Sequence, residues 1–142
     1  MRLLSCLLLM VFAVAGSSGA FAQQRSVAPD DASVYFISPA NGAVVSSPVR
    51  VRFGLSNMGV APAGVNINGT GHHHLLIDLE TLPPMDASMP ASDQLRHYGG
   101  GQTETLLELD PGTHTLQLLM GNFLHIPHER PVISEKITIT VR

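Results

Sequence analysis

Histidine is the residue type in this chain whose number and spacing could do chemistry. All seven histidines lie between His72 and His128. Three are consecutive, at positions 72, 73 and 74, and His125 and His128 close a loop-like stretch. Neutral imidazole is the commonest protein metal ligand, and it titrates near neutral pH. The histidines therefore point toward a metal site, although they name no reaction.

The three consecutive histidines cannot all bind one ion if they lie on a strand. Side chains of neighbouring strand residues point to opposite faces. His73 shares its face with more apolar residues than His72 and His74 do, so we expect His73 to point toward the rim of the core. The predicted metal ligands are a subset of six histidines: His72, His73, His74, His97, His125 and His128.

Copper is the favoured ion for such a site, and zinc is the alternative. Imidazole suits zinc, copper, iron and nickel, and its affinity for divalent ions is highest for Cu²⁺. A thioether would favour Cu⁺, and Met58 and Met120 are the methionines expected near the histidines. Filling of the core is the preferred interpretation of both methionines.

The acidic residues suggest supporting roles only. Glu104 and Glu135 are expected at the starts of strands, where a carboxylate could orient a metal-bound imidazole. A solvated strand end is the plainer interpretation of both. No catalytic residue is predicted, because the chain contains no G-x-S-x-G motif or other nucleophile signature.

The N-terminus has the pattern of a secretory signal peptide. Arg2 precedes an apolar run from Leu3 to Ala15, and Ala20-Phe21-Ala22 forms an A-x-A cleavage site. We expect residues 1–22 to be removed, together with Cys6, and the mature protein to lie in the periplasm or to be secreted. The apolar run is short for a membrane span, and no second run follows it.

The expected mature chain is mildly acidic. Without Arg2 it has 7 basic and 11 acidic residues, a net charge of −4. The basic residues are scattered and form no stripe, which argues against nucleic acid as a partner. A metal ion is the expected partner, and a protein of the cell envelope is a second candidate.

The hydrophobic pattern predicts an all-β domain. Short runs of strand character are separated by turns rich in Pro and Gly, and no segment has a convincing helical period. We expect strands at residues 34–37, 49–55, 74–79, 103–109, 114–120 and 136–141. They predict a single immunoglobulin-like antiparallel β-sandwich of about six to seven strands over residues 33–142, after a loose tail at 23–32.

This topology would bring six of the histidines to one pole. The connection before the third strand, the start of the fourth strand and the connection before the last strand would all lie there. Two of these connections, 56–71 and 80–101, are long, and long loops in small domains are often functional. His114 begins the fifth strand at the other pole, so a structural role is expected for it.

The chain resembles a bacterial secreted family known as domain of unknown function 4399 (DUF4399). The resemblance runs from about Tyr35 to the C-terminus. It is carried by the segments 37–39, 41–42, 58–64, 71–78, 97–104, 111–118, 125–128 and 134–137. Asn122-Phe123-Leu124 departs from it, because the family tends to have a more polar, Asp-containing turn there.

The resemblance implies a compact domain of the cell envelope and no established activity. It implies that eight residues belong to the motif set of the family: His72, His73, His74, His97, Gln102, Glu104, His125 and His128. Gln102 is therefore a further residue expected to support the site.

Three functions compete on this sequence. The first is periplasmic metal binding for storage, delivery or buffering. The second is a binding module for a small ligand, a glycan or a protein, in which histidines supply hydrogen bonds. The third, the least favoured, is an enzyme with an open metal position and Glu104 as its general base.

Overall fold

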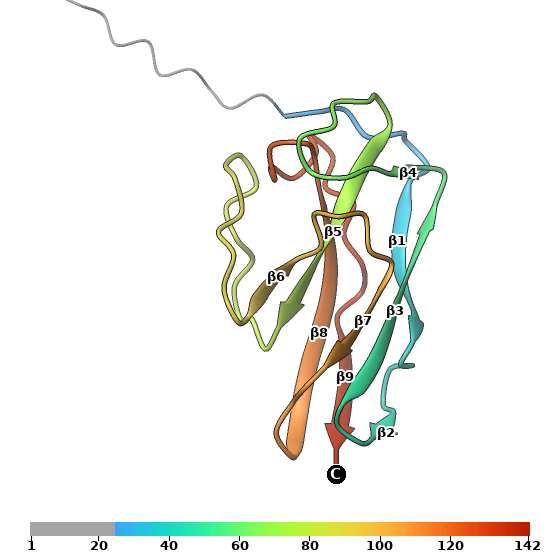
Figure 1. The fold of residues 1–142 in the computed structure, drawn as a ribbon, viewed down its shortest axis with the longest axis vertical. Coiled ribbons are helices and arrows are strands. Elements are labelled where there is room, and N and C mark those ends of the chain that lie inside the picture. Colours follow the sequence, from blue (N-terminus) through green and yellow to red (C-terminus); the bar gives the residue numbers. More distant parts are fainter. Residues whose placement is uncertain (1–24) are drawn as a thin grey trace, which may run out of the picture.

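The computed structural model describes residues 25–142, so the predicted signal peptide lies outside the described residues. The described residues form nine strands and no helix (Figure 1). Among them is no helix long and apolar enough to cross a membrane. The prediction of an all-β domain is confirmed.

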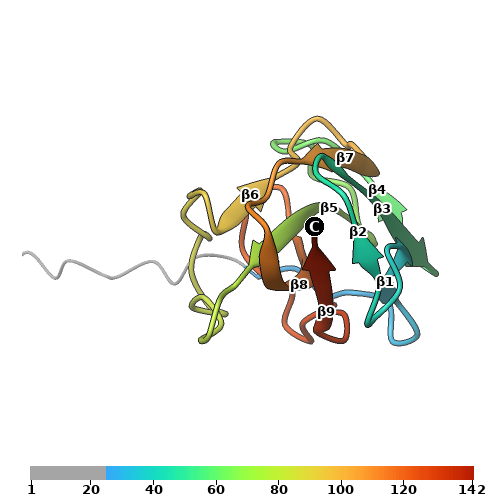
Figure 2. The same ribbon diagram turned by 90° about the horizontal axis from the view of Figure 1, so that it is seen from below.

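The strands form two sheets that pack as layers, as the end-on view in Figure 2 shows. The smaller sheet has the order β1-β3-β7 and contains β1 (Ser33–Ser38), β3 (Val49–Ser56) and β7 (Glu104–Leu107). The larger sheet has the order β2-β9-β8-β5-β4, and β6 also pairs with β5. Its strands are β2 (Val44–Val45), β4 (Gly59–Val60), β5 (Thr70–Ile77), β6 (Leu95–His97), β8 (Gly112–Gly121) and β9 (Ile137–Val141).

The prediction that all pairing is antiparallel is wrong for the larger sheet. β2 pairs with β9 in parallel, and β4 pairs with β5 in parallel. Both added strands are two residues long, so each is a piece of a connection that joins an existing sheet. Two residues are too few to show a period in the sequence, which is why neither strand was predicted.

The main core lies between the two sheets and follows the period of two. In β3, Val49, Val51 and Phe53 are buried and alternate with exposed Arg50 and Arg52, as predicted. β5 contributes Leu75 and Ile77 to the same core, and β8 contributes Leu116, Leu118 and Met120. Each such side chain stabilises the fold by about 1.5–3 kcal/mol relative to an exposed position.

A second, smaller apolar cluster lies on the outer face of the larger sheet. It consists of Leu76, Met89, Leu95 and Leu119. Met89 belongs to the long connection between β5 and β6, which therefore covers this face. As a result β5 is buried on both faces along most of its length.

The N-terminal segment 25–32, predicted to be a loose tail, lies against the domain. Ala28 and Ala32 are buried and contact the main core. The guanidinium of Arg25 donates hydrogen bonds to the carbonyl oxygens of Pro127 and Glu129, at 3.3 and 2.9 Å. The segment thus holds the connection that follows β8.

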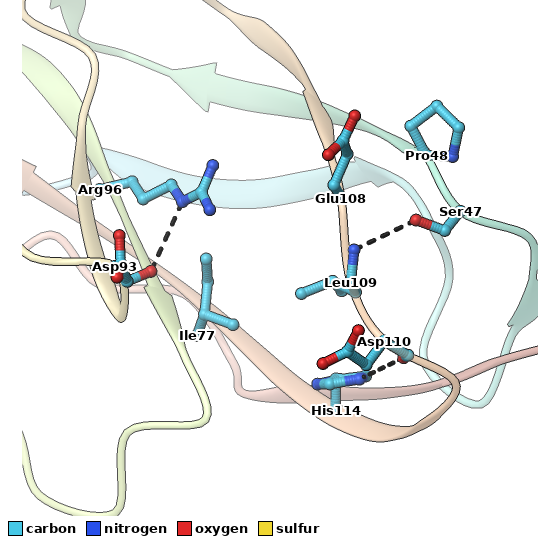
Figure 3. Close-up of a pocket in the computed structure, with 9 residues that line it drawn as sticks. All are labelled: Ser47, Pro48, Ile77, Asp93, Arg96, Glu108, Leu109, Asp110 and His114. Carbon is cyan, nitrogen blue, oxygen red and sulfur yellow. Dashed lines mark hydrogen bonds between the residues drawn. The ribbon is translucent and has the colours of Figure 1, made fainter.

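His114 has the structural environment predicted for it. Its Nδ1 lies 2.7 Å from Oδ2 of Asp78, and its Nε2 lies 2.9 Å from the carbonyl oxygen of Asp110. The other carboxylate oxygen of Asp78 accepts a hydrogen bond from the Thr115 amide at 2.7 Å. Figure 3 shows His114 and Asp110 at the edge of a polar pocket near the start of β8. The hydrogen bond to Asp78 raises the pKa of His114 above 6.5.

The raised pKa of His114 predicts a specific pH dependence of stability. The protonated ring is favoured in the folded state, so its stabilising effect is fully present below the unfolded pKa of 6.5 and is lost as the pH rises through the folded pKa. His114→Asn should therefore reduce the free energy of unfolding more at about pH 5.5 than at about pH 9. Urea unfolding across this range measures the difference.

Asp78→Asn is the control for this experiment, because it removes the carboxylate that raises the pKa. In that background, His114→Asn should have a much weaker dependence on pH. An equal effect of His114→Asn at both pH values in the native background would contradict the assignment.

Candidate metal centre

Two histidines of the site come from β5, and a third comes from its neighbour β6. His72 and His74 are two residues apart and point to the outer face of the larger sheet. In the strand register, His74 lies opposite His97 of β6 on one side and Leu119 of β8 on the other. Residues directly opposite in a sheet point to the same face. The register therefore places the His97 ring beside that of His74.

The fourth histidine, His125, lies on the connection after β8. Its backbone has a φ of 65°, in the left-handed region, and its amide donates to the Asn122 carbonyl at 2.8 Å. The side-chain oxygen of Asn122 accepts hydrogen bonds from the amides of Leu124 and Ile126, at 2.9 and 3.1 Å. Asn122 is 1% exposed. This buried amide shapes the turn that presents His125.

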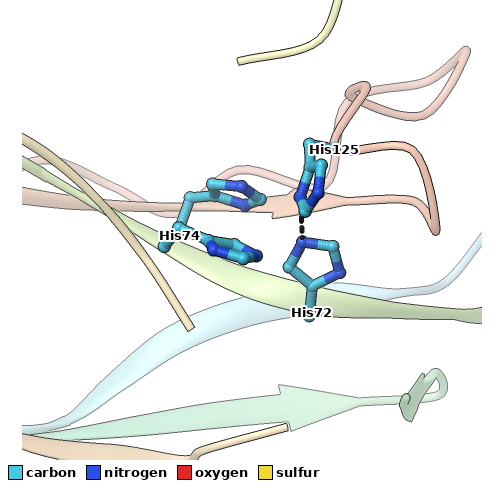
Figure 4. Close-up of side chains that lie close together, drawn as sticks. His72, His74 and His125 are labelled. Atoms are coloured by element: carbon cyan, nitrogen blue, oxygen red, sulfur yellow. Dashed lines mark hydrogen bonds between the residues drawn. The ribbon is translucent and has the colours of Figure 1, made fainter. Parts of the chain in front are cut away.

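The structure brings His72, His74, His97 and His125 together. Each offers one ring nitrogen, and these four atoms all lie within 4.8 Å of one another. Nε2 of His72 and Nδ1 of His125 are 3.0 Å apart and share a hydrogen bond (Figure 4). In a tetrahedral site with metal–nitrogen bonds of about 2.0–2.1 Å, the nitrogens are about 3.3 Å apart. Closure around an ion would therefore need only small side-chain movements and the loss of that hydrogen bond.

His72 and His74 of β5 form the buried inner side of the site, the floor of the site, and their imidazole rings are neutral. His72 is 0% exposed and His74 is 1% exposed. Burial is the largest cause and the charges of His125 and His97 add to it, and together they lower the pKa of His72 to about 3. Burial likewise lowers the pKa of His74 to about 2. Neutral rings keep nitrogen lone pairs free to bind a metal ion.

Buried ring nitrogens without hydrogen-bond partners occur in the same two residues, and also in His73 and His128 outside the group. Among the described residues, Nδ1 of His72 and both ring nitrogens of His74 have no hydrogen-bond partner. The backbone of His72 partly opposes the lowering of the His74 pKa, but no hydrogen bond of normal geometry forms there. Buried polar atoms are usually paired, so these nitrogens fit a site that receives a ligand.

His97 and His125 are the outer ligands of the group. His97 is exposed and His125 is partly buried. The pKa of His97 is lowered, first by the partial loss of solvent around its ring and then by the charge of His125. Their ring centroids are 4.4 Å apart. The site therefore has a buried floor on a central strand and an outer side that solvent reaches.

Two glycines make room for the rings. A Cβ atom on Gly121 would lie 2.6 Å from Cε1 of His74, and one on Gly99 would lie 2.2 Å from Cε1 of His97. Both contacts are shorter than real side chains tolerate. Any larger residue at position 121 or 99 would displace a histidine of the cluster.

The other two predicted ligands lie outside this group. His73 points inward, as predicted, and its ring packs against Phe53 with centroids 5.1 Å apart. Burial lowers its pKa to about 4. His128 is buried, with Nε2 3.3 Å from the Thr70 carbonyl oxygen. A Cβ on Gly71, which shares the inner face with His73, would lie 3.0 Å from Cε1 of His128.

The residues predicted to support the site have other contacts. Glu104 lies on the smaller sheet, 2.8 Å from the Arg50 guanidinium and 3.6 Å from that of Arg52. The side-chain oxygen of Gln102 accepts from the Gly100 amide at 3.0 Å. Glu135 lies between β8 and β9, and its carbonyl accepts from the Ser134 hydroxyl at 2.8 Å.

Met58 and Met120 agree with their preferred interpretation as core residues and not with the alternative of copper ligation. Met120 lies in the main core, and the methyl carbon of Met58 would lie 3.1 Å from a Cβ on Gly71. Both therefore lie on the inner side of the larger sheet. Met89 and Met85 lie on the outer face, and the methyl carbon of Met89 lies beside the His74 ring. Met89 sits in a connection without periodic pattern, so no signal in the sequence could have located it.

The chain belongs to the family described as Domain of unknown function (DUF4399), whose model matches residues 51–142. The matched region contains all four histidines of the cluster. No curated protein and no solved structure matches the chain.

A substitution at Gly121 tests how closely the His74 ring is confined by its surroundings. Gly121→Ala should lower the free energy of unfolding by about 1–3 kcal/mol, because the new methyl group overlaps the His74 ring. Chemical unfolding of the metal-free protein measures this. Gly59→Ala is the control, since Gly59 is exposed and its nearest neighbour would be a Thr70 methyl at 3.1 Å. Equal effects of the two substitutions would show that the ring is not confined.

Proposed function

We propose that this protein binds a metal ion in the cell envelope, with copper favoured and zinc as the alternative. The observation that carries the proposal is the cluster of four imidazoles formed by His72, His74, His97 and His125. The predicted signal peptide supports a location in the periplasm or outside the cell. The ion would be held for storage, delivery or buffering.

The composition of the cluster supports a metal over an ordinary hydrogen-bond network. Its four members are all histidines, so no carboxylate in the group can pair with a protonated ring. Protonating one ring is opposed by burial and by the charge of the others. A single metal ion can serve as the partner of all four ring nitrogens, because each neutral imidazole donates a lone pair to it.

The ligand number supports binding rather than catalysis. Four protein ligands fill a tetrahedral site, whereas catalytic zinc sites keep one position open for water or substrate. The carboxylate predicted as a general base, Glu104, is paired with Arg50 and Arg52 on the smaller sheet. This leaves storage or delivery as the role that agrees best with the site.

The immunoglobulin-like architecture expected from the sequence is part of the proposal. Its support is the distribution of the longer strands, with β1, β3 and β7 in one sheet and β5, β8 and β9 in the other. In such a sandwich the connections before β5 and after β8 lie at the same end. That arrangement agrees with the meeting of His72 and His125.

Metal analysis of the purified protein tests the proposed function. Protein isolated from the periplasm without chelator should carry near-stoichiometric copper or zinc, or bind one equivalent with a saturable titration. His72→Ala, His74→Ala and His125→Ala should each weaken binding by about 100-fold or more, because each removes one of four ligands.

His114→Ala is the matched control, because His114 lies at the other end of β8 and is held by Asp78. It should leave the metal affinity unchanged. Metal-free protein with only weak, non-saturating binding would reject the proposed function. It would favour a module that binds a non-metal ligand at the same histidines.

A further inference from the structure

We propose that the thioether of Met89 is a ligand of Cu⁺ at the four-histidine site, where it takes the place of one of the two outer imidazoles, and that it makes Cu⁺ the preferred ion over Zn²⁺. This inference rests on the proposed function and deepens it by naming the metal. It concerns a residue that is neither a histidine nor part of the strands that form the floor of the site.

Met89 places the end of its side chain beside a ring of the cluster. Its methyl carbon lies 3.0 Å from the position that a Cβ on Gly121 would take, and Nδ1 of His74 lies 3.1 Å from the same position. The methyl end of the thioether and the His74 ring therefore border one small space, which the glycine leaves open. Nδ1 of His74 is one of the buried nitrogens without a hydrogen-bond partner among the described residues.

The backbone of Met89 is tied to a second member of the cluster. Its amide donates a hydrogen bond to the carbonyl oxygen of His125 at 3.0 Å. Met89 is 5% exposed, so its side chain is held out of solvent. The backbone of Met89 is thus held by its hydrogen bond to His125, and the end of its side chain lies beside His74.

The chemistry of sulfur distinguishes this residue from an apolar filler. Its neighbours in the outer cluster are Leu76, Leu95 and Leu119, which offer no donor atom. A thioether is a soft ligand that selects Cu⁺, whereas four imidazoles alone suit Zn²⁺ and Cu²⁺. A site with both kinds of ligand can hold copper in either oxidation state.

Met85 supplies a matched comparison within the same connection. It is partly buried and packs against the same apolar cluster, but its side chain is not among the nearest atoms around Gly121. Substitution of either methionine by leucine preserves size and hydrophobicity. Only the Met89 substitution should remove a ligand.

The first test compares the affinities of the wild-type protein, Met89→Leu and Met85→Leu for two ions. Cu⁺ affinity is measured anaerobically by competition with a chromogenic Cu⁺ chelator, and Zn²⁺ affinity by competition with a chromogenic zinc chelator. Met89→Leu should weaken Cu⁺ binding by about tenfold or more and change Zn²⁺ binding by less than about twofold, because zinc makes little use of thioethers. Met85→Leu should change neither.

The second test is X-ray absorption at the copper edge of the Cu⁺-loaded protein. A sulfur neighbour should be present in the wild-type protein and in Met85→Leu, and absent in Met89→Leu. The wild-type spectrum is decisive even if Met89→Leu fails to fold, because a copper site with nitrogen neighbours alone overturns the inference.

The outcomes separate this inference from the proposed function. Wild-type protein that binds neither ion rejects both. Wild-type protein that binds metal with the same Cu⁺ affinity as Met89→Leu rejects only the role of the thioether. In that case the site would be a four-imidazole centre and Met89 an apolar contact.

Discussion

The constraint on which the site depends is the burial of two imidazoles among other imidazoles. His72 and His74 are almost inaccessible to solvent, and the nearest titratable neighbours of both are histidines. Burying a polar group without a partner costs free energy, and burying a charge costs more. The rings are therefore held neutral, and the fold around them must exclude water without supplying a counter-charge.

Two connections, rather than the sheets themselves, exclude water from the histidine cluster. The outer face of β5 would be exposed in a plain two-layer sandwich. The connection between β5 and β6 covers it, and the connection after β8 covers its end. The hydrogen bond from the Met89 amide to the His125 carbonyl oxygen links these two connections. Arg25 and the residues after it brace the second connection from the N-terminal side.

The parts of this arrangement that could be predicted from the sequence are the strands in which apolar and polar residues alternate with a period of two. The alternation in β3 is clear because one face meets the core and the other meets solvent. The same rule correctly placed His73 on the inner face and His72 and His74 on the outer face. The approach of His97 and His125 to these residues was expected for a different reason, the assumed order of the strands in an immunoglobulin-like sandwich.

The rest depends on contacts that leave no local pattern. His72 and His74 are buried, although they lie on the face turned away from the main core, because the irregular connections after β5 and after β8 cover them. β2, β4 and β6 are too short to show alternation. Met89 reaches the site only because Gly121, which lies 32 positions further along the chain, leaves space for it.

The four histidines come from separate parts of the chain. Binding of an ion by all four therefore depends on the chain being folded. Only His72 and His74 are neighbours in sequence, so an unfolded chain cannot present all four rings to one ion. A ligand bound by the native state alone raises the free energy of unfolding as its free concentration rises above the dissociation constant. In a metal-binding role, the melting temperature of this protein would therefore report the concentration of free metal around it.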